Sequence, residues 1–324
     1  MSSIILSMDI IIKGLQEEVS RKAIYVTPQQ FEYGLVEKRI LVTGANGQLG
    51  NEIRQRQSLL RNYKFFFTDL DELNVCDPEA ISDFVIHHNI QYIINCAAYT
   101  AVDKAEDEPE LCWKVNCEAV ENVAKAAAGK ARVIHISTDY VFDGKGHRPY
   151  QETDPAHPQS VYGKSKWAGE EQLMLHCPDS IIIRTSWLYS PYGNNFVKTM
   201  LRLGKEKESL SVVTDQTGTP TYAGDLATVI LQIIARTEAT QTFAPGIYHY
   251  SNEGICSWYD FALQIHQLAE ITTCKVNPIP ASEYPTKATR PMYSVLDKTK
   301  IKQTFGIAIP GWEESLKACM KLIA

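Results

Sequence analysis

Hydrophobic and polar positions alternate in two kinds of segment from residue 39 onward. Short, mostly apolar runs predict buried strands, and they lie at 39–44, 63–69, 92–98, 132–138 and 180–187. Between them, apolar positions recur with a helical period, which predicts helices at 51–61, 78–89, 109–128 and 163–176. Strands and helices in this alternation predict an α/β fold of Rossmann type, with a doubly wound parallel sheet and right-handed crossovers.

The order of elements loosens after residue 190, where proline-bearing loops separate the helical segments. We therefore expect one domain at 39–190 and a smaller C-terminal lobe at 191–324, with some segments that return to the first domain. Residues 1–38 begin apolar but lack the basic region and cleavage pattern of a signal peptide, so we expect a poorly ordered extension. Helices in the lobe are predicted at 195–207, 222–238, 257–270 and 312–323.

Composition narrows the classes of partner. The 324 residues are 44% hydrophobic and carry a net charge of -6, so no basic field favours nucleic acid or an anionic membrane. We expect no membrane-spanning segment, because no apolar run is long enough. The eight cysteines are scattered without a C-x-x-C pair, which favours reduced thiols in a cytoplasmic protein.

A glycine-rich turn, TGANGQLG, follows the first predicted strand and leads into a helix. Gly44 permits the tight turn, Gly47 lets a phosphate approach the backbone, and Gly50 lets the helix pack closely on the strand. Backbone N–H groups at the start of that helix can hold a pyrophosphate without a lysine. The turn predicts that 39–190 binds NAD(P) and that 191–324 mainly binds substrate; a purely structural turn is the alternative.

Two further segments flank the predicted dinucleotide crevice. Asp69 ends the second predicted strand, where a carboxylate can accept from an adenosine ribose hydroxyl, and this favours NAD over NADP. Asp71 and Glu72 lie beside it, and all three could instead be solvated loop charges. Ala97 and Ala98 are small enough for a flat cofactor to lie close to the strand ends, although tight packing explains them nearly as well.

The stretch VYGKSKWAGE places Tyr162 and Lys166 four residues apart, on one face of a predicted helix. Thr138 ends the strand before that helix, so the three side chains are predicted to converge at the crevice. A phenol near pKa 10 is a weak proton donor at neutral pH, and a neighbouring Lys166 cation would lower its pKa. This constellation suits proton transfer to a carbonyl that receives hydride; an exposed Tyr–Lys surface pair is the alternative.

At these residues the chain resembles the extended short-chain dehydrogenase/reductases, whose pattern joins a T-G-x-x-G-x-x-G turn to Y-x-x-x-K. Within them it is similar to the dTDP-4-dehydrorhamnose reductase family, from about Arg39 to the C-terminus, in blocks such as NCAAYTAVDKAEDEPELCWKVN, STDYVFDG, RTSWLYSPYGNNFVKTMLRL, DQTGTPT and YPTKATRP. The resemblance implies that NADPH or NADH reduces the C4 keto group of dTDP-4-dehydro-β-L-rhamnose to give dTDP-β-L-rhamnose, the last step of dTDP-rhamnose biosynthesis.

The resemblance also implies roles for individual residues. Tyr162 matches the proton donor, Lys166 its partner on the cofactor ribose, and Thr138 a hydroxyl that contacts the substrate. Asp139 belongs to the same substrate-binding segment, and Trp187 matches an aromatic platform for the deoxysugar. The remaining matches to cofactor-binding positions are Asn46, Gly47, Gln48 and Leu49 in the glycine turn, Asn74 and Val75 after the second strand, and Ala98, Tyr99 and Thr100 after the third.

The chain departs from the family in two places. Asn74 stands where the family often has aspartate, so an amide replaces a carboxylate at the implied adenine contact. Family members can bind Mg²⁺ near a dimer interface, and Glu52 fits one such carboxylate. Gly224 stands where a second is expected, with Asp225 adjacent, so we expect no resident metal, while a homodimer is possible.

Three questions stay open from the sequence. Lys198, Arg202 and Arg290 are candidates for holding a substrate diphosphate, although each could be a solvated surface charge. The nearest rival enzyme is a nucleotide-sugar epimerase or dehydratase of the same family. The rival from another class is a non-catalytic regulatory subunit with this fold, such as the partner of a methionine adenosyltransferase.

Overall fold

Six parallel strands form the central sheet of this protein, whose computed structural model describes residues 37–323. The sheet order is β10-β5-β4-β3-β1-β2, so the chain adds β2 on one side of β1 and β3 on the other. That reversal puts a topological switch point between β1 and β3. The strands are β1 (Lys38–Thr43), β2 (Tyr63–Thr68), β3 (Tyr92–Asn95), β4 (Arg132–Thr138), β5 (Ser180–Thr185) and β10 (Gly246–His249).

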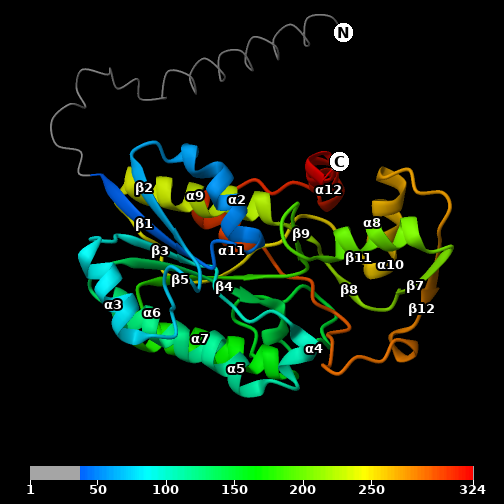
Figure 1. The fold of residues 1–324 in the computed structure, drawn as a ribbon, viewed down its shortest axis with the longest axis horizontal. Coiled ribbons are helices and arrows are strands. Elements are labelled where there is room, and N and C mark those ends of the chain that lie inside the picture. The colour runs from blue at the N-terminus through cyan, green and yellow to red at the C-terminus, as the bar shows by residue number, and fades with distance from the viewer. Residues whose placement is uncertain (1–36, 324) are drawn as a thin grey trace, which may run out of the picture. The chain divides into compact units, whose positions relative to one another are not determined.

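The Rossmann-type α/β fold is confirmed, and its layers follow from the strand sequences. Successive strand residues point to opposite faces, and here both faces are apolar. Ile40 and Ile94 join a core with α9, whereas Leu41 and Ile93 join a core with α3 and α6. Figure 1 shows the two helical layers on either side of the sheet. They contain α2 (Gln48–Arg56), α9 (Ala223–Thr240) and α11 (Thr299–Phe305) on one face, and α3 (Pro78–His87), α6 (Ala119–Ala127) and α7 (Val161–His176) on the other.

The helix predicted at 109–128 is interrupted. It consists of α5 (Pro109–Trp113), a π-helical turn (Lys114–Glu118) and α6. Asn116 lies in this turn, fully buried, and its side-chain amide accepts from the Tyr99 N–H (2.8 Å) and donates to the Tyr99 carbonyl (3.0 Å). The widened turn therefore lets one side chain satisfy the backbone after β3, which itself ends at Asn95 rather than at the predicted residue 98.

Residues after 186 build a second core beside the sheet. Phe261 of α10 and Leu316 of α12 pack there with Val197 of α8. Residues 38–323 nevertheless form one compact unit, and β10 joins the main sheet, so the division at residue 190 stays a prediction. The remaining elements are α4 (Val102–Ala105), β6 (Leu188–Tyr189), α8 (Phe196–Glu206), β7 (Ser209–Val213), β8 (Thr217–Gly218), β9 (Thr221–Tyr222), β11 (Cys256–Ser257), α10 (Trp258–Leu268), β12 (Lys275–Ile279) and α12 (Trp312–Ile323).

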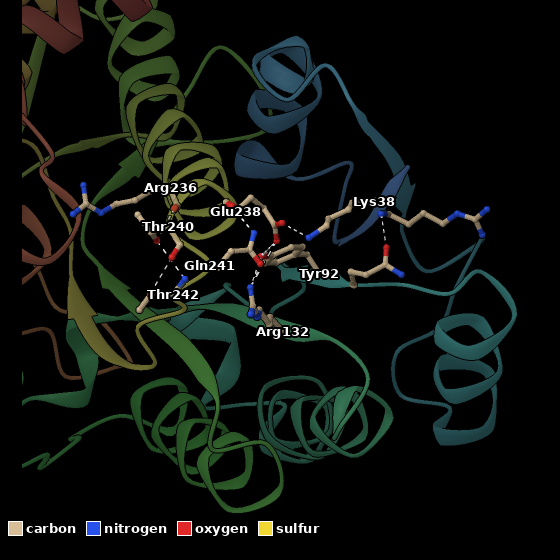
Figure 2. A network of polar contacts seen from close by, with 10 residues as sticks. Lys38, Tyr92, Arg132, Arg236, Glu238, Thr240, Gln241 and Thr242 are labelled. Atoms are coloured by element: carbon tan, nitrogen blue, oxygen red, sulfur yellow. Dashed lines mark hydrogen bonds and ion pairs between the residues drawn. The ribbon is translucent and has the colours of Figure 1, made fainter. Parts of the chain in front are cut away.

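A polar network fastens α9 to the N-terminal edge of the sheet (Figure 2). Glu238 near the end of α9 forms an ion pair with Lys38 of β1 and accepts from the Tyr92 hydroxyl of β3 (2.6 Å). Arg132 of β4 donates to the same hydroxyl (2.9 Å).

The predicted extension at 1–38 lies outside the described residues, apart from its last two. Within 37–323 no helix is long and apolar enough to cross a membrane.

Candidate active site

A cavity of about 790 Å³ opens at the C-terminal ends of the parallel strands. Its wall combines the turn after β1, the segments after β2, β3, β4 and β5, and the first turns of α7. It therefore lies at the switch point, where doubly wound folds bind their ligands. Predicted site residues that line it are Gly44, Gly47, Gln48, Leu49, Asp69, Asn74, Val75, Ala97, Ala98, Thr100, Thr138, Asp139, Tyr162, Lys166 and Trp187.

The glycine turn has the geometry of a phosphate cradle. Gly44 has a φ of +62°, and a Cβ there would lie 2.7 Å from the Ala97 nitrogen across the switch point. Gly50 packs just as closely on Ala45, so α2 can approach β1. Gly47 caps α2 without a side-chain hydrogen bond, and the first turn holds no acidic residue. The uncapped N–H groups and the helix dipole at this end suit a pyrophosphate.

Three predicted cofactor residues, Asn46, Gly50 and Tyr99, lie next to the cavity but do not line it. The Asn46 N–H donates to the Asp69 carboxylate (2.9 Å), which also accepts from the Leu70 N–H (2.9 Å). Asp69 thus joins the glycine turn to the end of β2, with its carboxylate in the cavity wall. Gly50 acts through packing, and the Tyr99 hydroxyl is directed away to Glu108 (2.7 Å).

Tyr162, Lys166 and Thr138 come together in the cavity as the sequence spacing predicts. The first two lie in α7, whose N-terminus is capped by Ser160 accepting from the Gly163 N–H (3.1 Å). Thr138 is the last residue of β4, the strand that precedes this helix. Tyr162 is 9% exposed and Lys166 is 2% exposed, so the exposed-pair alternative does not hold.

The pKa of Tyr162 is shifted in the direction opposite to the one that the sequence predicts from a neighbouring Lys166 cation. Burial raises the pKa of the Tyr162 phenol well above its usual value, and a hydrogen bond with Thr138 opposes that shift only in part. Burial also lowers the pKa of Lys166 to about 8. The Lys166 amine donates to the Ile136 carbonyl (2.7 Å) rather than to the phenol. The protein alone therefore keeps the phenol protonated, because the phenol is buried.

Asp139 and Trp187 form another part of the cavity wall. Asp139 is 3% exposed; one carboxylate oxygen accepts from the Thr138 hydroxyl (3.1 Å), and Oδ2 has no partner within residues 37–323. Burial raises its pKa to about 7. Trp187 has a φ of +49°, a strained conformation for a bulky residue. Its ring stacks on Trp258 at 3.6 Å between centroids and 12° between planes.

The sequence did not single out three features of this site. Tyr140 packs edge-on against Tyr162, with ring centroids 5.4 Å apart. Trp258 backs Trp187 from a distant helix, and no local pattern pairs two tryptophans 71 positions apart. Gln48 was assigned to the phosphate turn, yet its side chain also accepts from Asn195 Nδ2 (3.0 Å) and donates to the Leu188 carbonyl (3.4 Å).

The three candidate diphosphate cations lie outside the cavity wall. Lys198 donates to the Pro191 carbonyl (3.1 Å), and Arg202 is an exposed partner of Glu206 (2.7 Å). Arg290 forms an ion pair with Asp103 (2.6 Å) and donates to the Tyr140 hydroxyl (3.4 Å). Tyr140 lines the cavity, so it lies between Arg290 and the cavity. Of the three, only Arg290 contacts a residue that lines the cavity.

The residues around Glu52 do not fit a divalent metal. Glu52 is buried and already forms an ion pair with Arg56, one turn along α2. The Arg56 guanidinium also donates to the Tyr222 hydroxyl (3.4 Å), and a Cβ at Gly224 would collide with it. The cation next to Glu52 is thus a side chain of the protein, and a carboxylate at 224 would have to displace it.

Comparison with known proteins identifies the family. The profile described as the RmlD substrate binding domain matches residues 38–324. The chain belongs to this family. A dTDP-4-dehydrorhamnose reductase of Aggregatibacter actinomycetemcomitans is 45% identical over 285 residues, which are 86% of this chain and 97% of the relative.

Solved structures of RmlD-family relatives agree. The dTDP-4-dehydrorhamnose reductase ortholog of Clostridium acetobutylicum is 44% identical and superposes with a TM-score of 0.83 over 88% of this chain and 99% of its own. That of Bacillus anthracis, solved in complex with NADP, is 39% identical with the same TM-score over 88% and 99%. These relatives are matched over nearly their whole length.

Proposed function

We propose that this protein is an NAD(P)H-dependent dTDP-4-dehydrorhamnose reductase. It reduces the C4 keto group of dTDP-4-dehydro-β-L-rhamnose to give dTDP-β-L-rhamnose. The observation that carries this proposal is the convergence of the glycine turn and the Thr138–Tyr162–Lys166 trio on one cavity, in a chain that matches reductases along almost their full length.

Each group has a role in the proposed reaction. The dinucleotide, its pyrophosphate at the start of α2, supplies the hydride that adds to C4, and is left oxidised. Tyr162 donates its phenolic proton to the carbonyl oxygen, so that C=O becomes CH–OH. Thr138 hydrogen-bonds the same oxygen and sets its angle, while Lys166 holds the nicotinamide ribose. Such acid–base assistance accelerates reactions by about 10²–10⁴-fold.

The choice between NADPH and NADH follows from residues near Asp69. A carboxylate at this position favours a free ribose hydroxyl over a phosphate, but its two oxygens already accept from Asn46 and Leu70. With those bonds made, Asp69 discriminates less strongly than an unbonded carboxylate would. We propose that both dinucleotides support turnover, in keeping with the relative that binds NADP.

The rival enzyme differs in what happens to the cofactor. An epimerase or dehydratase regenerates its dinucleotide in each cycle, whereas a reductase consumes one NAD(P)H per product. Stoichiometric loss of absorbance at the NAD(P)H band supports the reductase; product without net loss supports the rival. A regulatory subunit would give neither, and the buried trio is a costly arrangement for a protein without catalysis.

The decisive experiment replaces Tyr162 by phenylalanine. With dTDP-4-dehydro-L-rhamnose and NADPH we expect turnover by the wild type and a loss of about 10²-fold or more in kcat for Tyr162→Phe, because the proton donor is removed. Tyr63→Phe is the control, since Tyr63 starts β2 at the edge of the sheet opposite the cavity. Equal rates for wild type and Tyr162→Phe would remove the phenol from the mechanism.

We propose that the reaction takes place in the cytoplasm. All eight cysteines are free thiols, which supports a reducing compartment. The predicted homodimer stays a prediction.

A further inference from the structure

Three polar side chains cross the centre of the sheet in one row. Thr43, Asn95 and His135 are in-register neighbours on β1, β3 and β4, and none is more than 2% exposed. We call these three residues the polar row. It begins one residue before the glycine turn and ends beneath the catalytic helix, where His135 Nε2 lies 3.5 Å from the amine of Lys166.

Hydrogen bonds give the polar row a direction. The Thr43 hydroxyl donates to Asn95 Oδ1 (2.7 Å), and Asn95 Nδ2 lies 3.1 Å from His135 Nδ1. An amide nitrogen can only donate, so Nδ1 of the imidazole accepts. A neutral imidazole carries one proton, which must then be on Nε2. Burial and the Lys166 charge lower the pKa of His135 well below its usual value, so the ring is neutral.

The direction matters for the group at the end of the row. The Nε2–H group of His135 needs an acceptor. If Lys166 is charged, its ammonium group has only donors to offer; if Lys166 is neutral, its amine nitrogen has a lone pair that can accept. The row therefore favours the amine. Within residues 37–323 the amine has two partners, His135 and the Ile136 carbonyl. The other titratable groups that affect Lys166 are Glu170 one turn along α7, Cys96 after β3 and Cys112 of α5.

We propose that the polar row is a positioning device for Lys166, which fixes the imidazole tautomer facing the amine and so sets which form of that side chain meets the cofactor ribose. Burial of three polar groups in the centre of a sheet is costly unless each is satisfied. This row satisfies each one and ends at a residue of the proposed mechanism. Burial by itself also lowers the pKa of Lys166, to about 8, so burial and the polar row favour the same form of the side chain.

The tautomer can be measured without substrate. In protein labelled with ¹⁵N-histidine, long-range ¹H–¹⁵N NMR distinguishes Nδ1–H from Nε2–H, and His135→Gln identifies the His135 signals among the eight histidines. We expect Nε2–H in the wild type from pH 6 to 9. An Nδ1–H or charged ring would overturn the proposal. This result is independent of reductase turnover, on which the role of Lys166 rests.

Reversing the row tests its effect on Lys166. A carboxylate in Asn95→Asp accepts from Nδ1–H, which moves the ring proton and leaves Nε2 as an acceptor for the ammonium. We expect the Nδ1–H tautomer. The loss of kcat/KM that accompanies deprotonation of Lys166 near pH 8, above the fall assigned to Asp139, should move up by about one unit. The same substitution in a His135→Phe background measures the direct effect of the new charge. Equal shifts in both backgrounds would contradict a path through the imidazole.

A second pair of variants tests the polar row even if the Asn95→Asp protein does not fold. Thr43→Val keeps the side-chain shape and removes the hydroxyl that orients the Asn95 amide, so a mixture of His135 tautomers is expected. Thr237→Val is its control, because Thr237 is equally buried in α9 and its hydroxyl has no partner in the described part of the chain. An unchanged single tautomer in Thr43→Val would show that the row does not act as a unit.

Discussion

Tyr162 and Asp139 are both acids that burial makes weaker, with different consequences. The phenol stays protonated at any physiological pH and is available as a donor. The carboxyl of Asp139, with a pKa of about 7, changes charge within the working range. Below pH 7 its carboxyl is neutral; above pH 7 it is a buried anion beside the Thr138 hydroxyl.

We therefore predict that kcat falls as pH rises through about 7 in the wild type, and that Asp139→Asn flattens this part of the profile. Asparagine keeps the shape and a donor but cannot ionise. Steady-state rates from pH 5.5 to 8.5 measure the effect, with the exposed Asp83→Asn of α3 as control. A fall at the same pH in Asp139→Asn would assign it to another group.

The same group links pH to stability. The folded-state pKa of Asp139 is raised above its ordinary value of 3.8, so its contribution to the free energy of unfolding is full at low pH. That contribution is lost as pH rises from about 3.8 to about 7. Asp139→Asn should accordingly raise Tm at pH 8 relative to the wild type more than it does at pH 5.

At the scale of elements, the strained turn after β5 depends on a helix far away in sequence. Trp187 adopts a positive φ and is held by its stack on Trp258 at the start of α10 and by its carbonyl, which accepts from the Thr221 N–H (3.1 Å). A side chain at Gly218 would strike the same indole. Several independent contacts thus hold Trp187 in one orientation. A strained backbone conformation persists only when the surrounding structure holds it in this way.

Trp258→Leu should loosen the packing of the Trp187 ring, the predicted platform for the deoxysugar. Because an aromatic pair contributes about 0.5–1.5 kcal/mol beyond its buried area, we expect KM for the nucleotide sugar to rise roughly 10-fold. The Kd for NADPH, measured by fluorescence titration, should stay unchanged. Trp113→Leu on α5 is the control. A parallel loss of NADPH affinity would point instead to a general disturbance of the cavity.

Local patterns were enough to predict five of the six strands of the main sheet, all except β10, together with the glycine turn and α7, since apolar runs, glycine spacing and the Tyr–Lys repeat are all short-range signals. The sequence could not show where long-range contacts override them. The end of β3 and the π-helical turn both serve the Asn116–Tyr99 contact. The pKa of Tyr162 depends on burial and on the neighbouring Thr138 and Asp139 side chains, which a four-residue spacing cannot specify.

For the molecule as a whole, we expect the polar network at the N-terminal ends of β1, β3 and β4, drawn in Figure 2, to contribute stability. Burial raises the pKa of Glu238, but the bonds from Lys38 and Tyr92 outweigh it and leave the pKa lowered. Its stabilising contribution is present above the unfolded-state pKa and lost as pH falls through the folded-state pKa.

We predict that Glu238→Gln lowers the free energy of unfolding by roughly 1 kcal/mol at pH 7, a modest value because Lys38 and Arg132 are partly exposed. The difference from the wild type should shrink toward pH 3. Urea denaturation at both pH values measures it, and kcat should be unaltered. A difference that persists at pH 3 would assign the effect to packing rather than charge.

The side chain of Gln48 belongs to two places at once, the pyrophosphate turn and the segment around Asn195. We therefore expect a ligand that moves the turn to alter the Gln48–Asn195 hydrogen bond as well. Thermodynamic linkage then imposes a symmetry: whatever factor a bound dinucleotide applies to the affinity for the sugar, the sugar applies to the affinity for the dinucleotide.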